Sequence, residues 1–276
     1  SYLTTLFSSA YGAQSSLLDT IYGIGGSSGG STDPLQALHS AEVNQTQDVK
    51  ATAAQPMVKS AIAQFTQAVN SAKSMTQLLA NPAFMNVLLS ANGLGDQIGY
   101  TALATKALTS KISDPNSLVN KLSDTRWKTL AQNYDFSSTG LASFRDPKTI
   151  ASIANLYATD NWQTSQDQVT PGLSNALAFK TQAASIASVD QVLGNMVMRT
   201  VITTALGIPP QIAYQTINAQ EKAISSRIDL KKFQDHKFVE TFVQQYLIAS
   251  KAAAASSSSS SPDLTSLSVQ GQGILV

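Results

Sequence analysis

The 276-residue sequence contains no cysteine and only two histidines, His39 and His236. The absence of cysteine excludes disulfides, thiolate metal ligands and cysteine nucleophiles. Each histidine lies near an expected helix start, where a solvated side chain is more common than a metal ligand. We therefore predict no metal site, no cofactor and no catalytic residue.

Charge is also scarce: 13% of the residues are charged, against about 25% in an average soluble domain. Eighteen basic and seventeen acidic side chains give a net charge of +1, which argues against a chain-wide cationic surface for nucleic acid. The sequence has no apolar run of the roughly 18 residues that a membrane span needs. We expect no membrane span and no nucleic-acid partner.

Residues 1–24 have apolar side chains at approximately helical spacing: Leu3, Leu6, Phe7, Tyr11, Leu17, Leu18 and Ile21. A Gly/Ser-rich stretch over residues 23–31 follows and predicts a flexible linker. Residues 1–32 are therefore predicted to form an amphipathic arm, which needs an apolar surface on its own domain or on a neighbouring subunit. The first residues also lack a basic n-region and a cleavage site, so we expect no ordinary cleaved signal.

From Asp33 onward the apolar periodicity is helical, and no alternation typical of strands is found. Five polar residues followed by proline predict helix starts, because the first can cap a helix whose first position suits proline. These pairs are Asp33-Pro34, Asn81-Pro82, Asp114-Pro115, Asp146-Pro147 and Thr170-Pro171. The predicted fold class is all-α.

An internal repeat is found when the sequence is shifted by 114 residues. The shift superposes identical residues in both halves: Phe65 on Phe179, Leu79 on Leu193, Asn81 on Asn195, Gly93 on Gly207, Ile98 on Ile212 and Tyr100 on Tyr214. With small gaps, residues 124–127 also match residues 235–238. We interpret this as a duplication that gives two tandem, divergent helical domains, residues 33–137 and 138–250. In each copy a helix is expected to end at Gly93 or Gly207, and a new one to run through residues 98–100 or 212–214.

Residues 251–276 change character again. An Ala/Ser run over residues 252–261 predicts a tether. Beyond it, apolar and polar residues alternate in a way that predicts a second, extended arm. The apolar residues of this arm are Leu264, Leu267, Val269, Ile274 and Val276.

Motifs that carry chemistry are missing or poorly placed. Residues 26–30 match G-x-S-x-G, but they lie in the Gly/Ser linker and not between a strand and a helix. There is no P-loop, dinucleotide fingerprint or H-E-x-x-H pattern. The alternating charges of residues 221–240 predict an ion-paired helix surface. Trp127 is expected in the core, and Trp162 at the surface or between domains.

Residues 207–212 and 226–240 resemble an uncharacterised helical domain family, domain of unknown function 1217. The family often has more than one copy in a chain and is associated with flagellated alphaproteobacteria and flagellar genes. It has no established catalytic residues. The resemblance therefore implies a flagellar setting and no active site.

We expect a non-enzymatic structural subunit of a flagellum or related extracellular filament, in an accessory, sheath-like or axial position. Low charge, no cysteine and many small polar residues are typical of subunits exported through the flagellum. The subunit would assemble with copies of itself, and with axial or filament proteins, through the apolar residues of both arms. The alternative is a cytoplasmic helical adaptor, an export chaperone or a regulator of flagellar assembly, that binds its partner through residues 221–240.

Overall fold

The computed structural model describes residues 33–136 and 140–259. Within these ranges every regular element is an α-helix or a short 3-10 helix, and no strand occurs, so the all-α prediction is confirmed. The predicted arm residues, Leu3 to Ile21 and Leu264 to Val276, lie outside the described ranges. Their role in assembly stays a prediction.

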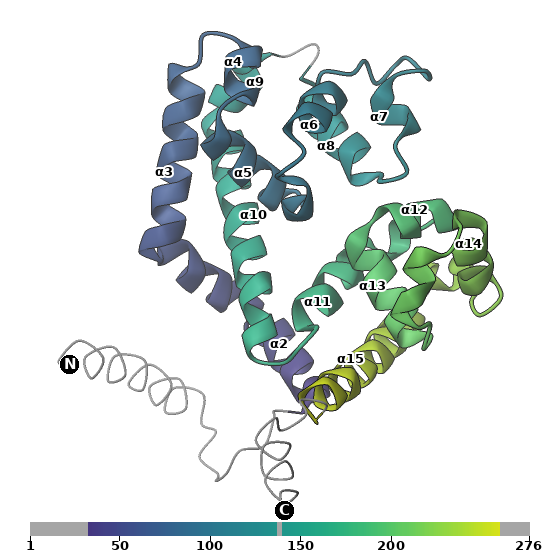
Figure 1. The fold of residues 1–276 in the computed structure, drawn as a ribbon. Coiled ribbons are helices and arrows are strands. Elements are labelled where there is room, and N and C mark those ends of the chain that lie inside the picture. The colour runs from purple at the N-terminus through teal and green to yellow at the C-terminus, as the bar shows by residue number, and fades with distance from the viewer. Residues whose placement is uncertain (1–32, 137–139, 260–276) are drawn as a thin grey trace, which may run out of the picture. The chain divides into compact units, whose positions relative to one another are not determined.

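The helices follow one another with short connections (Figure 1). The first part of the chain contains α2 (Pro34–Ala54), α3 (Pro56–Ser71), α4 (Met75–Leu79), α5 (Pro82–Ala91), η1 (Gly95–Gln97), α6 (Thr101–Leu108), α7 (Leu118–Lys121), α8 (Arg126–Tyr134) and α9 (Leu141–Arg145). The second contains α10 (Pro147–Ser165), η2 (Gln166–Gln168), α11 (Leu173–Gln182), η3 (Ala183–Ser185), α12 (Val189–Gly194), α13 (Met196–Ala205), η4 (Pro210–Tyr214), α14 (Ile217–Ser225), η5 (Leu230–Gln234) and α15 (His236–Ser259).

Three of the five expected helix starts are confirmed. The side chains of Asp33, Asn81 and Asp146 accept hydrogen bonds from the first turns of α2, α5 and α10, each with proline at the first position. The prediction was wrong for Asp114, which accepts from the backbone of Asn116 within a turn. It was also wrong for Thr170, because Gly172 in a left-handed conformation precedes α11. In this chain a polar residue before proline therefore begins either a helix or a turn.

Gly93 and Gly207 end their helices as expected. Both have positive φ, 69° and 61°, a conformation that glycine adopts without a Cβ penalty. The next residue of each then donates back to the helix, Leu94 to Leu89 and Ile208 to Thr203. The helices expected through residues 98–100 and 212–214 are instead 3-10 turns or irregular, and α6 and α14 begin a few residues later.

Buried side chains form two clusters. The first core draws on α3 to α9 and the start of α10, with Phe65, Phe84, Phe144 and Trp127 at its centre. Phe84 stacks on Phe65 and meets Phe144 edge-on, with both pairs of ring centroids 5.2 Å apart. Trp127 is 1% exposed, which confirms its predicted place.

The second core draws on α2, the end of α10 and α11 to α15. α10 belongs to both cores, because Ile153 is buried in the first, Trp162 in the second, and Tyr157 packs against each. Trp162 is only 2% exposed, so a place at the surface is wrong, while the alternative place between domains stays a prediction. Its position on the inner face of a long shared helix buries it.

The two cores do not divide the chain at residue 137. α2 precedes this position, yet Ala37, Leu38 and Ala41 pack in the second core. Phe144 and Ile153 follow it, yet they pack in the first. The boundary between residues 137 and 138 therefore describes a division of the sequence repeat, and as a domain boundary it stays a prediction.

The same order of local structure occurs in both halves. Ser74 caps α4 and Ser188 caps α12 through the backbone of Gln77 and Gln191, and each glutamine side chain accepts from the residue before its serine. α5 and α13, capped by asparagine, begin and end at positions 114 residues apart. Both serines therefore cap their helices with the same set of hydrogen bonds, at positions 114 residues apart.

Beyond α6 and α14 the correspondence continues at a different shift. α9, Asp146 and α10 match η5, Asp235 and α15, because Leu141 and Phe144 align with Leu230 and Phe233, and both aspartates accept from the second residue after them. The expected match of residues 124–127 with 235–238 is therefore not supported by the packing. α7 and α8 have no described counterpart in the second half.

α15 extends to Ser259 and so includes the alanines of the expected tether. Alanine has the highest helix propensity of all residues, so an Ala/Ser run that follows a helix continues it.

Candidate functional site

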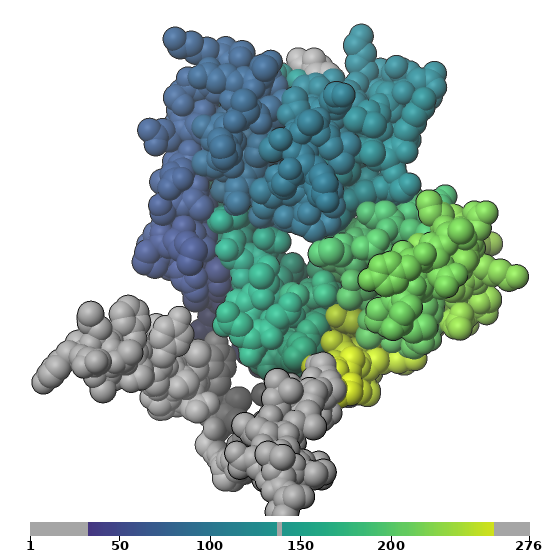
Figure 2. Space-filling model, viewed as in Figure 1, coloured from purple at the N-terminus to yellow at the C-terminus, as the bar shows by residue number. Residues whose placement is uncertain are grey.

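A cleft of about 600 Å³ lies where residues of both cores meet. In Figure 2 it opens between the blue-teal surface of the first core and the green surface of the second. α5, α8, α10, α11 and α13 supply its lining. Most lining side chains are serine, threonine, asparagine or glutamine, and the charged ones are Arg126 and Asp160.

Arg126 is the centre of a buried ion-pair network at one wall of the cleft. Its guanidinium binds Asp124 at 2.7 Å and Asp96 at 2.9 Å and also donates to the backbone carbonyl of Gly93. Burial alone would raise the pKa of Asp96, but hydrogen bonds from Arg126 and Gln97 outweigh it and lower that pKa. Burial disfavours the charged form of Arg126, yet its bonds to Asp124 and Asp96 raise its pKa above the ordinary value. The network fixes α8 to the turn after α5.

Asp160 lies on α10 in the lining of the same cleft. Burial raises the pKa of its carboxyl group to about 6, because a partly desolvated carboxylate loses favourable hydration. Arg126 is the other charged residue of the lining, and its guanidinium is already bound to two aspartates. The cleft therefore offers hydrogen-bonding groups and one titratable acid, a surface suited to polar or weakly cationic groups.

A second ion-pair cluster joins three helices of the second core. Lys180 of α11 pairs with Glu42 of α2 and, at 2.5 Å, with Glu240 of α15. Burial opposes the charge of Lys180, but its bonds to Glu240 and Glu42 raise its pKa overall. His236 lies 3.6 Å from Glu240 and is 83% exposed. This cluster holds helices together and lines neither pocket.

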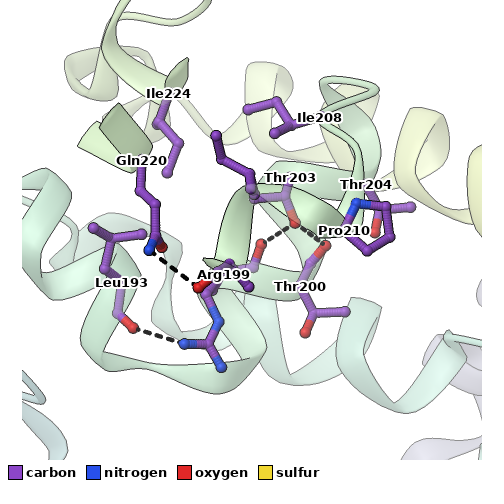
Figure 3. A pocket seen from close by; sticks show the side chains of 11 residues that line it. Leu193, Arg199, Thr200, Thr203, Thr204, Ile208, Pro210, Gln220 and Ile224 are labelled. Atoms are coloured by element: carbon purple, nitrogen blue, oxygen red, sulfur yellow. Dashed lines mark hydrogen bonds between the residues drawn. The ribbon is translucent and has the colours of Figure 1, made fainter. Parts of the chain in front are cut away.

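A smaller groove of about 240 Å³ lies between α13, η4 and α14 (Figure 3). Leu193, Ile208 and Ile224 supply apolar walls, and Arg199 is its one charged lining residue. The guanidinium of Arg199 donates to the backbone carbonyl of Leu193 at 3.3 Å, as drawn in Figure 3. The groove is thus apolar inside and carries a cation at its rim.

Large apolar side chains are exposed beside this groove. Tyr214, at the end of η4, is 92% exposed and Ile217, at the start of α14, is 64% exposed. Tyr100, 114 residues before Tyr214, is also 60% exposed. Neighbouring exposed apolar groups of this kind mark interaction surfaces more often than isolated ones do.

The remaining expectations have mixed outcomes. Among residues 33–136 and 140–259, no group of three His, Asp or Glu side chains could hold a metal ion. No helix in these ranges is both long and apolar enough to cross a membrane. The ion pairs seen for residues 221–240 all involve Glu240, while Lys232 lies over the ring of Phe238. The predicted ion-paired surface is therefore sparse.

Sequence reasoning missed the Asp96–Arg126–Asp124 network and Asp160. Their partners are up to 30 residues apart in the chain, and each residue type is common on helix surfaces. No local pattern distinguishes them, because their environment arises only when the cores are packed.

A family model identifies the family of the chain, and a solved structure shares its fold. The family described as "Protein of unknown function (DUF1217)" matches residues 91–239, more than half of the chain. A structural genomics target from Agrobacterium tumefaciens has a similar crystal structure, with a TM-score of 0.63 and 24% identity over 81% of this chain and 96% of that one. No curated protein matches significantly. The chain therefore belongs to this family of unknown function, as its resemblance predicted.

Proposed function

We propose that the chain is a non-enzymatic structural subunit that assembles with copies of itself through its terminal segments. The observation that carries the proposal is the exposed apolar surface of Tyr214 and Ile217 beside an apolar groove. The chain also has apolar terminal segments that are linked to the helical body by Gly/Ser-rich or Ala/Ser-rich sequence. The exposed apolar surface of one copy could therefore bind an apolar terminal segment of another. Burying apolar surface contributes about 25 cal/mol per Å².

The proposed setting is a flagellum or a related extracellular filament. The resemblance to a family found with flagellar genes motivates this part of the proposal. Few charges, no cysteine and abundant small polar residues also suit a subunit that is exported unfolded. The subunit would take an accessory, sheath-like or axial place.

The alternative is a cytoplasmic adaptor, such as an export chaperone or assembly regulator. Residues 221–240 carry exposed lysines with few ion-pair partners, a surface that could bind an acidic partner. Such an adaptor would stay monomeric or form small complexes inside the cell.

Two measurements separate these functions. Negative-stain microscopy of the purified full chain should show filaments, rings or layers for a structural subunit and single particles for an adaptor. Sheared surface appendages of the source bacterium, probed with an antibody against the chain, should contain it if it is extracellular. A chain found only in the cytoplasm and only as single particles contradicts the proposal.

A further inference from the structure

The first core shows how a helix covers the turn that follows α5. α8 packs on α6 and buries Trp127 and Leu130, each 1% exposed. Arg126, the first residue of α8, binds both Gly93 and Asp96 of the turn. The seat formed by α5, η1 and α6 is therefore occupied by a helix of the same chain.

In the second half the corresponding seat lacks that helix, and its last helix, α14, packs on α12. α13, η4 and α14 correspond to α5, η1 and α6, but the chain then continues directly into η5 and α15, the counterparts of α9 and α10. The groove of Figure 3 lies at this seat, since Ile208 and Pro210 occupy the repeat positions of Leu94 and Asp96. Within the described residues nothing takes the place of α8.

The residues at this seat keep an apolar floor with a more polar rim. Leu79 and Leu94 of the first core become Leu193 and Ile208, which stay apolar. Met85 and Leu89, 4% and 0% exposed, become Arg199 and Thr203. This combination suits a surface that meets water in the free chain and is covered on assembly.

Resting on the proposed function, we infer that the groove between α13, η4 and α14 receives the N-terminal segment, residues 1–24, of a second copy of the chain. This segment has the apolar spacing of a helix, the element that fills the seat in the first core, whereas residues 263–276 have an alternating pattern. Asp19 is its one charged side chain, and Arg199 is the one charged residue of the groove lining. The single charge of the segment and the single charge of the groove lining are therefore opposite in sign.

Disulfide trapping tests this docking directly, because the chain has no cysteine of its own. A full-length chain with Ser16→Cys, one helical turn before Asp19, is mixed under oxidising conditions with a tagged full-length Ala213→Cys chain. Gly99→Cys is the matched control, since it is the repeat position of Ala213 and an added Cβ there meets open space. A non-reducing gel then reports heterodimers.

We expect heterodimers with Ala213→Cys and few with Gly99→Cys. Arg199→Glu should lower their yield about threefold, and Asp19→Arg in the other chain should restore it. Equal yields of heterodimer with Ala213→Cys and Gly99→Cys would overturn the inference. If the wild-type chain assembles and loses assembly without residues 1–24, but no cross-link forms, the groove is wrong and the proposed function stands. If the wild-type chain does not assemble at all, the proposed function itself fails.

Discussion

At the scale of single residues, Arg126 has the largest structural role among the charged side chains. It neutralises the buried carboxylate of Asp124 and the half-buried carboxylate of Asp96, and it joins α8 to the turn after α5. Removing one member of a buried ion pair lowers stability much more than replacing all its members by apolar residues. The reason is that the remaining charge stays buried without its partner.

Arg126→Met should therefore destabilise the chain by about 3–5 kcal/mol, measured by urea denaturation. Arg227→Met is the matched control, since the exposed side chain of Arg227 donates to the backbone of Ala223, and its effect should be small.

The same network predicts a pH dependence. Because the pKa of Asp96 is lowered in the folded chain, the contribution of Asp96 to the free energy of unfolding is present above its unfolded pKa and is lost as the pH falls through its folded pKa. The loss caused by Arg126→Met should shrink in acid; a loss that is equal at all pH values would contradict the network.

Asp160 has the opposite effect on stability. Its pKa is raised from 3.8 to about 6 by burial, so its charged form is disfavoured in the folded chain. The penalty is present above pH 6 and disappears as the pH falls toward 4.

Asp160→Asn should raise the free energy of unfolding at pH 7, by at most about 3 kcal/mol from the pKa shift and by less if solvent reaches the carboxylate. The difference between variant and wild type should vanish near pH 4. Thermal unfolding followed by circular dichroism at both pH values checks this. A variant that is less stable than wild type at pH 7 would show that Asp160 has a stabilising partner.

At the scale of elements, α12 touches the segment that leads into α8. A Cβ on Gly194, the last residue of α12, would lie 2.9 Å from the backbone nitrogen of Asp124 and 2.9 Å from the Cβ of Ser123. This close approach joins α12, which packs in the second core, to the segment before α8, which packs in the first core.

Gly194→Ala should therefore destabilise the chain by about 1–3 kcal/mol, because the backbone of Asp124 cannot move aside without a shift of α8. Gly99→Ala, with no atom within 4 Å of its added Cβ, should change stability by less than about 1 kcal/mol. Melting temperatures of the two variants provide the comparison. Equal melting temperatures would mean that α12 and α8 do not pack as described.

Local signals explain which elements the sequence predicted. Asn81 and Asp146 cap the helices they were expected to cap, and Gly93 and Gly207 end theirs, because each signal acts within a few residues. The Asp114 turn shows the limit of such signals, since aspartate before proline stabilises turns as well as helices. The sequence therefore predicted that these segments are helical, but it did not predict which polar residues before proline start a turn instead.

At the scale of the whole molecule, α10 explains what the sequence could not predict. Apolar periodicity identifies a buried face but does not say against which core it packs, so the burial of Trp162 in the second core and the sharing of α10 were not predicted. The cleft has the same origin, because its lining is drawn from residues 90–198. The groove was equally hidden, since Leu193 and Ile224 come together only when α12 and α14 pack.

The central claim is that the terminal segments join copies of the chain, and deletion of residues 1–24 tests it most directly. Sedimentation velocity of the purified full chain and of the chain lacking these residues would be compared at equal concentration, with circular dichroism to confirm that both are folded. The account predicts large assemblies for the full chain and a folded monomer for the deleted one. Unchanged assembly after the deletion, or a full chain that remains monomeric, would contradict it.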